Sequence, residues 1–214
     1  MMSQTSLAAP VAPEELAARL AARLCHDIMS PLSAIAAGLD FLGEAANQGA
    51  RDEATELLGE GVRGLTGRLA FYRLAFGHGA EAVETGDLKT LAATLFADRR
   101  PRLDWQVEDQ ALPSAAARVL LNLVQIAAET LAVGGVARVA TPGRAVVRIE
   151  AIGPRARLQP ETRAGLAGEA LAAGLGGRWA QARFVRALVD GAGGELAIDS
   201  RDEVVVFTAR LPAP

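Results

Sequence analysis

Apolar residues recur every three or four positions through the first third of the chain, which is the spacing of one face of an α-helix. The first run begins at Pro13, a residue tolerated in a first helical turn, and the polar residues 47–49 are expected to break it. A second run covers residues 54–76 and is expected to end at 77–79. The pattern predicts two long antiparallel helices joined by a short loop.

Each predicted helix carries an apolar stripe that a single hairpin cannot cover. Pairing of two copies into a four-helix bundle would bury both stripes, so we expect a homodimer. Residues 1–12 lack a basic start and a long apolar stretch, and we expect a disordered tail there and not a secretory signal. The stripe of the first helix consists of Leu16, Leu20, Leu24, Ile28, Leu32, Ile35, Leu39 and Leu42.

The character of the chain changes after residue 78. Residues 79–86 are expected to be a linker, and residues 87–214 mix helical periods with strand-like alternation. This mixture predicts an α+β protein, in which the helical hairpin, residues 13–78, is followed by an α/β sandwich. The predicted helices of the second part are 87–99, 113–131, 160–167 and 178–190, and the predicted strands are 103–107, 136–141, 144–152, 195–199 and 203–211.

Composition narrows the classes of function. The net charge of -3 implies no strongly basic face, so nucleic acid is not an expected partner. No apolar run reaches the roughly 18 residues of a membrane span, so no membrane partner is expected. Cys25 is the only cysteine, which excludes an intrachain disulfide and fits a cytoplasmic protein.

His26 is one of only two histidines and stands among residues suited to chemistry. It is two positions from Leu24 and from Ile28, about 200° around the helix from the apolar stripe. Its ring is therefore expected to project into solvent. One interpretation is an ordinary solvated histidine, and the other is a nucleophile, because a neutral imidazole has a nucleophilic nitrogen at neutral pH.

The neighbours of His26 favour the nucleophile. Asp27 can hold the tautomer of the ring or take a proton from it. Pro31 removes the amide that would bond the carbonyl of Asp27 and is expected to kink the helix, at a cost of about 3 kcal/mol in an ordinary helix interior. Ser30 can donate its hydroxyl to the carbonyl of His26.

Two further residues near His26 have open roles. Arg23, three positions earlier, either steadies a phosphoryl group or serves only as a solubilising charge. Leu32 continues the apolar stripe of the bundle and would also suit a docking surface for a partner.

The segment His26–Leu32, HDIMSPL, resembles the H-box of two-component histidine kinases, H-[ED]-x-x-[ST]-P-L. The flanking LAARLCHD and AIAAGLDFL resemble more closely the ChpT-type histidine phosphotransferases of alphaproteobacteria. The resemblance covers residues 14–211 and includes FYRLAFG, LNLVQIAAETL, GPRARL and GLGGRWAQA.

The second half resembles the ATP-binding domain of histidine kinases, a Bergerat or GHKL fold. The asparagine box, usually L-x-N-L-L-x-N-A, reads LLNLVQIA here. Asn122 is kept, whereas Ile126 replaces the asparagine that holds Mg²⁺ in the family.

The other two boxes are also altered. In place of D-x-G-x-G the chain has AIGPR, so Ala151 replaces the adenine-binding aspartate, Gly153 is kept and Arg155 replaces the last glycine. The glycine-rich lid keeps Gly174 and Gly176. The replaced residues are those that contact nucleotide and metal in the family, so we expect the chain to keep the fold but not to use ATP.

The resemblance implies a histidine phosphotransferase that relays phosphate between receiver-domain aspartates through His26. Its implied partners are the receiver domains of a hybrid histidine kinase and of response regulators that govern the cell cycle. No cofactor of its own is expected, because the receiver supplies Mg²⁺. An ATP-dependent sensor kinase and a non-catalytic dimeric scaffold are the alternatives.

Overall fold

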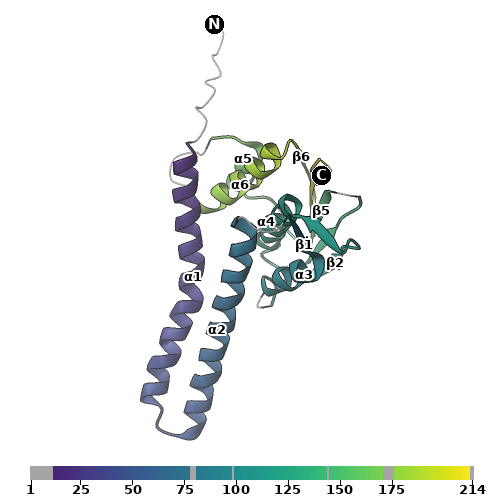
Figure 1. The fold of residues 1–214 in the computed structure, drawn as a ribbon. Helices are drawn as coiled ribbons and strands as arrows, with labels where there is room; N and C mark the ends of the chain where they lie inside the picture. The colour runs from purple at the N-terminus through teal and green to yellow at the C-terminus, as the bar shows by residue number, and fades with distance from the viewer. Residues whose placement is uncertain (1–11, 78–80, 98, 144, 171–175, 213–214) are drawn as a thin grey trace.

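The computed structural model describes residues 12–77, 81–97, 99–143, 145–170 and 176–212. Two long helices, α1 (Pro13–Glu44) and α2 (Gln48–Phe76), run side by side and project from a layered body of helices and strands (Figure 1). The predicted hairpin is therefore confirmed, while the predicted tail lies, except for Ala12, outside the described residues. Within the described part, no helix combines the length and apolarity that crossing a membrane requires.

The turn between α1 and α2 differs from the prediction. Asn47 does not simply break the first helix: its side-chain oxygen accepts a hydrogen bond from the amide of Ala50 at 3.0 Å, which caps the N-terminus of α2. Further along, a Cβ on Gly61 would lie 2.7 Å from Cγ1 of Ile35. Glycine is therefore required at Gly61 for the two helices to approach this closely.

Five strands form one mixed sheet beside the hairpin, in the order β2-β4-β5-β7-β6. β2 pairs in parallel with β4, and the other neighbours are antiparallel. The strands match the five predicted ones within a few residues, and their bounds are β2 Arg102–Gln106, β4 Val136–Ala140, β5 Val146–Ile152, β6 Glu195–Arg201 and β7 Val204–Arg210.

Helices cover one face of this sheet. Along β5, Val147, Ile149 and Ala151 are buried, whereas Arg148 between them is exposed, so only one side of the sheet meets the core. α4 packs against β5, and α6 packs against α4. The helices of this part are α3 Thr85–Thr94, α4 Ser114–Thr130, α5 Pro160–Ala167 and α6 Gly177–Gly191.

Two short strands were not predicted. β1 (Ala82–Glu84) occupies part of the expected linker and pairs antiparallel with β3 (Ala111–Pro113). Each has three residues, too few to show a period in the sequence. The hydroxyl of Thr85, just after β1, donates to the carbonyl of Asp109 at 2.6 Å and fixes the start of α3 beside this small sheet.

The hairpin and the layered body share one core. Phe71 and Ala75, near the end of α2, are fully buried in the same cluster as the apolar face of α4. On the other side, α1 packs against α6. The N-terminal half of α1 therefore lies against the body and not out along the free end of the hairpin (Figure 1), and Leu24 and Ile28, on either side of His26, pack against the shared core.

Candidate functional site

His26 lies on α1 at the edge of a cleft between this helix and the layered body. The cleft has a volume of about 700 Å³ and is lined by four arginines and three carboxylates, together with His26 itself. The side chain of His26 is 88% exposed, as the helical period predicted. Its ring is thus accessible to a large partner and stands in a strongly polar environment.

Asp27 is held in a defined position next to the ring. Its Oδ1 lies 3.3 Å from Nδ1 of His26, and its Oδ2 accepts a 2.8 Å hydrogen bond from the hydroxyl of Tyr72 on α2. Burial raises the pKa of Tyr72 well above its usual range, and the negative charge of Asp27 raises it further. Tyr72 therefore remains a hydrogen-bond donor to Asp27 across the physiological pH range.

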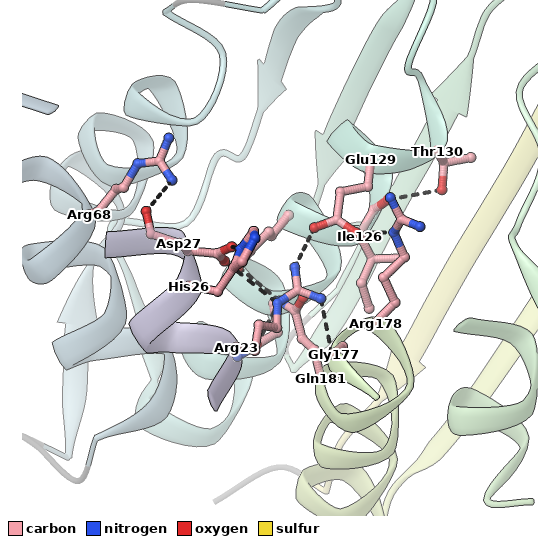
Figure 2. Close-up of polar contacts among 12 residues, drawn as sticks. Arg23, His26, Asp27, Arg68, Ile126, Glu129, Thr130, Gly177, Arg178 and Gln181 are labelled. Atoms are coloured by element: carbon pink, nitrogen blue, oxygen red, sulfur yellow. Dashed lines mark hydrogen bonds and ion pairs between the residues drawn. The ribbon is translucent and has the colours of Figure 1, made fainter. Parts of the chain in front are cut away.

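Arg68, also on α2, compensates for the proline in α1. The amide missing at Pro31 would have bonded the carbonyl oxygen of Asp27, four residues earlier. That oxygen instead accepts a 2.8 Å hydrogen bond from Nη1 of Arg68 (Figure 2). The helix runs without interruption through Pro31, because a side chain of the neighbouring helix satisfies the free carbonyl.

Arg23 connects α1 with the layered body. Its guanidinium forms an ion pair with Glu129 on α4 and donates to the carbonyl of Gly177, at the start of α6, at 3.2 Å (Figure 2). Its Nε lies 3.7 Å from Oδ2 of Asp27. Only 8% of this side chain is exposed, so Arg23 does not serve merely as a solubilising charge, and its contact with a phosphoryl group stays a prediction.

Ser30 and Leu32 are both exposed on α1. The predicted hydrogen bond from the Ser30 hydroxyl to the carbonyl of His26 is absent from the hydrogen bonds formed by the described residues. Leu32 contributes to an exposed apolar surface in the single chain, which is compatible with either of its predicted roles.

Asn122 belongs to a buried polar network. Its Nδ2 donates to the carbonyls of Ala75 and Arg118, both at 2.9 Å, and its Oδ1 accepts from Nε2 of Gln181 at 3.2 Å. The same Nε2 donates to Gln125 at 2.8 Å. The asparagine kept from the family's box therefore joins α4 to α2 and α6, and its polar groups are engaged with protein.

The residues at the two replaced positions do not fit a magnesium nucleotide. Ile126 and Ala151 are both buried in the hydrophobic core, where neither side chain offers an oxygen. Mg²⁺ requires oxygen ligands, and an adenine amine requires an acceptor. The side chains of Ile126 and Ala151 therefore supply neither a metal ligand nor an acceptor for adenine.

The backbone of the second box is better preserved than its chemistry. A Cβ on Gly153 would lie 2.6 Å from the carbonyl oxygen of Gly134, so glycine is required there. Arg155 has φ 60°, the left-handed conformation that the family's glycine would adopt freely. Gly176 precedes α6, and Gly174 lies outside the described residues.

Three residues of the site were not found from the sequence: Tyr72, Arg68 and Glu129. Tyr72 falls within the apolar run of residues 54–76, where a tyrosine at helical spacing predicts only a core residue, and its ring is indeed buried. Arg68 and Glu129 are charged residues, and no sequence motif around either of them indicates a functional role. Each reaches α1 through a tertiary contact that no local spacing encodes.

Comparisons with known proteins show what the chain as a whole is similar to. A family model, the histidine phosphotransferase C-terminal domain, matches residues 85–204. The protein phosphotransferase ChpT of Brucella abortus (strain 2308) is 30% identical over 212 residues, covering 95% of this chain and 99% of that protein. A solved bacterial phosphotransferase is 29% identical with a TM-score of 0.83, covering 96% of this chain and 100% of that one. A histidine kinase domain of Erythrobacter litoralis is 15% identical, with a TM-score of 0.48 and 93% of each chain covered.

Proposed function

The chain belongs to the ChpT-type histidine phosphotransferases of two-component phosphorelays, and we propose that His26 is the residue that carries the phosphoryl group. The observation that supports this assignment is its position. The His26 side chain is largely exposed on α1, beside the carboxylate of Asp27, whose other oxygen accepts a hydrogen bond from Tyr72. The only other histidine, His78, lies outside the described residues.

In the proposed mechanism, a receiver domain presents an aspartyl phosphate at the exposed ring. The lone pair of Nε2 forms the N–P bond as the O–P bond to the aspartate breaks, and the electron pair leaves with the receiver's carboxylate. A second receiver aspartate then attacks the phosphohistidine in the reverse sense. Asp27 keeps the Nδ1 proton hydrogen-bonded, so catalysis by this chain consists mainly of positioning.

We propose that the phosphoryl group comes from a receiver and not from ATP. Support comes from Ile126 and Ala151, whose buried apolar side chains stand where the family's kinases have nucleotide and metal contacts. On this proposal the chain needs no cofactor of its own, and Mg²⁺ arrives with the receiver. A single exposed thiol, Cys25, fits a reducing compartment and supports the cytoplasm as the place of action.

The proposed partners are the receiver domains of a hybrid histidine kinase and of response regulators in cell-cycle control. The resemblance stated above supports this choice. The receiver that donates the phosphoryl group and the receiver that accepts it must both reach the same histidine, and the exposure of His26 meets that requirement.

A second copy of this chain is the other proposed partner. Eight large hydrophobic side chains are exposed among the described residues, and all but Val133 lie on the hairpin. An apolar surface of this kind usually marks an interface. Pairing of two hairpins into a four-helix bundle would cover it. The hairpin members are Met29, Leu32, Leu39, Phe41, Leu42, Val62 and Leu69.

The assignment is tested by following acid-labile label on the protein. The chain is incubated with a phosphorylated receiver and, separately, with γ-labelled ATP. We expect label from the receiver only, lost in His26→Ala and kept in His78→Ala, which is a matched control because the chain has only these two histidines. Label from ATP alone would favour a kinase, and label that survives in His26→Ala would refute the site.

A further inference from the structure

Tyr72 is the only tyrosine of the chain, and its hydroxyl ends at the phosphoacceptor site. A buried tyrosine hydroxyl normally finds some hydrogen-bond partner, so a bond by itself has little meaning. Here the acceptor is Oδ2 of Asp27, and the other oxygen of the same carboxylate faces Nδ1 of His26. The choice of partner connects a core residue of α2 with the reacting ring.

The two oxygens of Asp27 have separate partners. Oδ2 accepts a 2.8 Å hydrogen bond from the Tyr72 hydroxyl and lies 3.7 Å from Nε of Arg23. Oδ1 lies 3.3 Å from Nδ1 of His26. A hydrogen bond to a charged group is stronger than one between neutral groups. The bond from Tyr72 therefore restricts rotation of the carboxylate and keeps Oδ1 directed at the ring.

Tyr72 itself has little freedom to move. Its ring packs edge-on against Phe71 and Phe76, with centroids 5.8 Å apart in each case. The backbone of Asp27 is fixed as well, through the hydrogen bond from Arg68, one turn before Tyr72 on α2. Both the side chain and the main chain of Asp27 are thus held by the neighbouring helix.

We propose that Tyr72 is a positioning residue for phosphotransfer, which holds Asp27 so that Oδ1 accepts the Nδ1 proton of His26 and Nε2 is left free to attack. The inference rests on the proposed role of His26 as phosphoacceptor. The tautomer of a neutral histidine is set by the hydrogen bond that one ring nitrogen makes. When the N–P bond forms at Nε2, the ring becomes cationic, and the fixed carboxylate stabilises that charge.

The first test reads the tautomer of His26 directly. Long-range ¹H–¹⁵N correlation spectra of the unphosphorylated protein, at a pH where the imidazole is neutral, distinguish the Nδ1–H from the Nε2–H form. We expect Nδ1–H to predominate, and its population to fall in Tyr72→Phe, which keeps the ring and removes the hydroxyl. Thr90→Val is the matched control, because it also removes a hydroxyl, one that donates to the carbonyl of Gly86 within α3 and not to Asp27, and the tautomer should stay as it is.

An unchanged tautomer in Tyr72→Phe would overturn the inference. These spectra need no partner and no phosphate, so they decide the role of Tyr72 independently of whether label reaches His26. A failure of labelling would overturn the proposed function instead. Thermal unfolding of Tyr72→Phe shows whether the variant is folded, and Asp27→Ala provides a second route to the same tautomer change should Tyr72→Phe unfold.

The second test asks whether Tyr72 acts through Asp27. Loss of one hydrogen bond to a charged group should slow transfer from a phosphorylated receiver to His26 by about tenfold in Tyr72→Phe. In an Asp27→Ala background the same substitution should have no further effect, because the group it positions is gone. An equal loss of rate in both backgrounds would show that Tyr72 acts by another route and would overturn the proposal.

Discussion

Arg23, three residues before His26 on α1, forms an ion pair with Glu129 on α4 (Figure 2). Only 8% of the Arg23 side chain and 22% of the Glu129 side chain are exposed. The same guanidinium also reaches the carbonyl of Gly177 at the start of α6. One side chain thereby joins the helix of His26 to two helices of the layered body.

Removal of this ion pair should destabilise the fold. In Arg23→Met, the ion-pair partner that Glu129 keeps among the described residues is Arg178, whose Nε lies 3.4 Å away and whose side chain is half exposed. Loss of a shielded pair leaves a charge without its partner, so we expect the free energy of unfolding to fall by about 2–3 kcal/mol. Urea denaturation at a fixed protein concentration measures the change.

The exposed pair Arg186–Asp190, within α6, is the control for this prediction. Arg186→Met should lower the free energy of unfolding by less than about 1 kcal/mol, because solvent screens the pair. Equal effects of the two substitutions would contradict the view that burial gives the Arg23–Glu129 contact its importance.

The difference between what was predicted and what was missed follows from distance along the chain. The long helices and the exposure of His26 depend on residues two to four positions apart, so the helical spacing of apolar residues in the sequence is enough to predict both. Tyr72 is 45 residues from Asp27, and Glu129 is 106 from Arg23. Contacts at such separations exist only after the fold has formed, so the sequence indicated His26 and Asp27 as candidates but not the side chains that contact Asp27 and Arg23.

The short elements were missed for another reason. β1 and β3 have three residues each, and their only structural signal is their pairing with one another. Asn47 was interpreted as a helix breaker although asparagine is also a favoured N-cap. A polar residue between two helical runs is compatible with both roles, and only the backbone of the turn distinguishes them.

The raised pKa of Tyr72 predicts a pH dependence of stability. Burial is its larger cause and the charge of Asp27 the next, while Arg68 and Arg23 oppose the shift. Because an exposed tyrosine titrates near ~10, the stabilisation from a neutral Tyr72 is fully present below that pH and is lost as the pH rises above it. Unfolding free energies measured through this range should fall for the natural chain and less steeply for Tyr72→Phe.

The same group can be titrated optically, since phenolate absorbance reports only Tyr72 in this chain. In Asp27→Asn the midpoint should move down, because the carboxylate charge is gone, yet stay above that of an exposed tyrosine, because burial remains. A titration midpoint of Tyr72 that is the same in Asp27→Asn and in the natural chain would contradict the contact between the two side chains.

The left-handed backbone at Arg155 predicts a stabilising substitution. With φ 60°, Arg155 occupies a conformation that costs a non-glycine residue about 1 kcal/mol and glycine very little. Arg155→Gly should therefore raise the free energy of unfolding by about 0.5–1 kcal/mol in thermal or urea unfolding. Arg157→Gly, two residues away and also exposed, removes the same charge without a positive φ and should destabilise slightly. Destabilisation by both would show that Arg155 has contacts that outweigh its strain.

The apolar surface of the hairpin predicts how the proposed dimer can be broken. Leu39 is 56% exposed in the single chain, so a charge there should leave the fold of the protomer intact. At the centre of a four-helix bundle the same charge would be buried without a partner, at a cost of several kcal/mol. Leu39→Glu should therefore be monomeric by light scattering at concentrations where the natural chain is dimeric. Val133→Glu, at the one exposed large hydrophobic residue found outside the hairpin in the described structure, should remain dimeric. A dimer that survives Leu39→Glu but is lost in Val133→Glu would move the interface from the hairpin to the layered body.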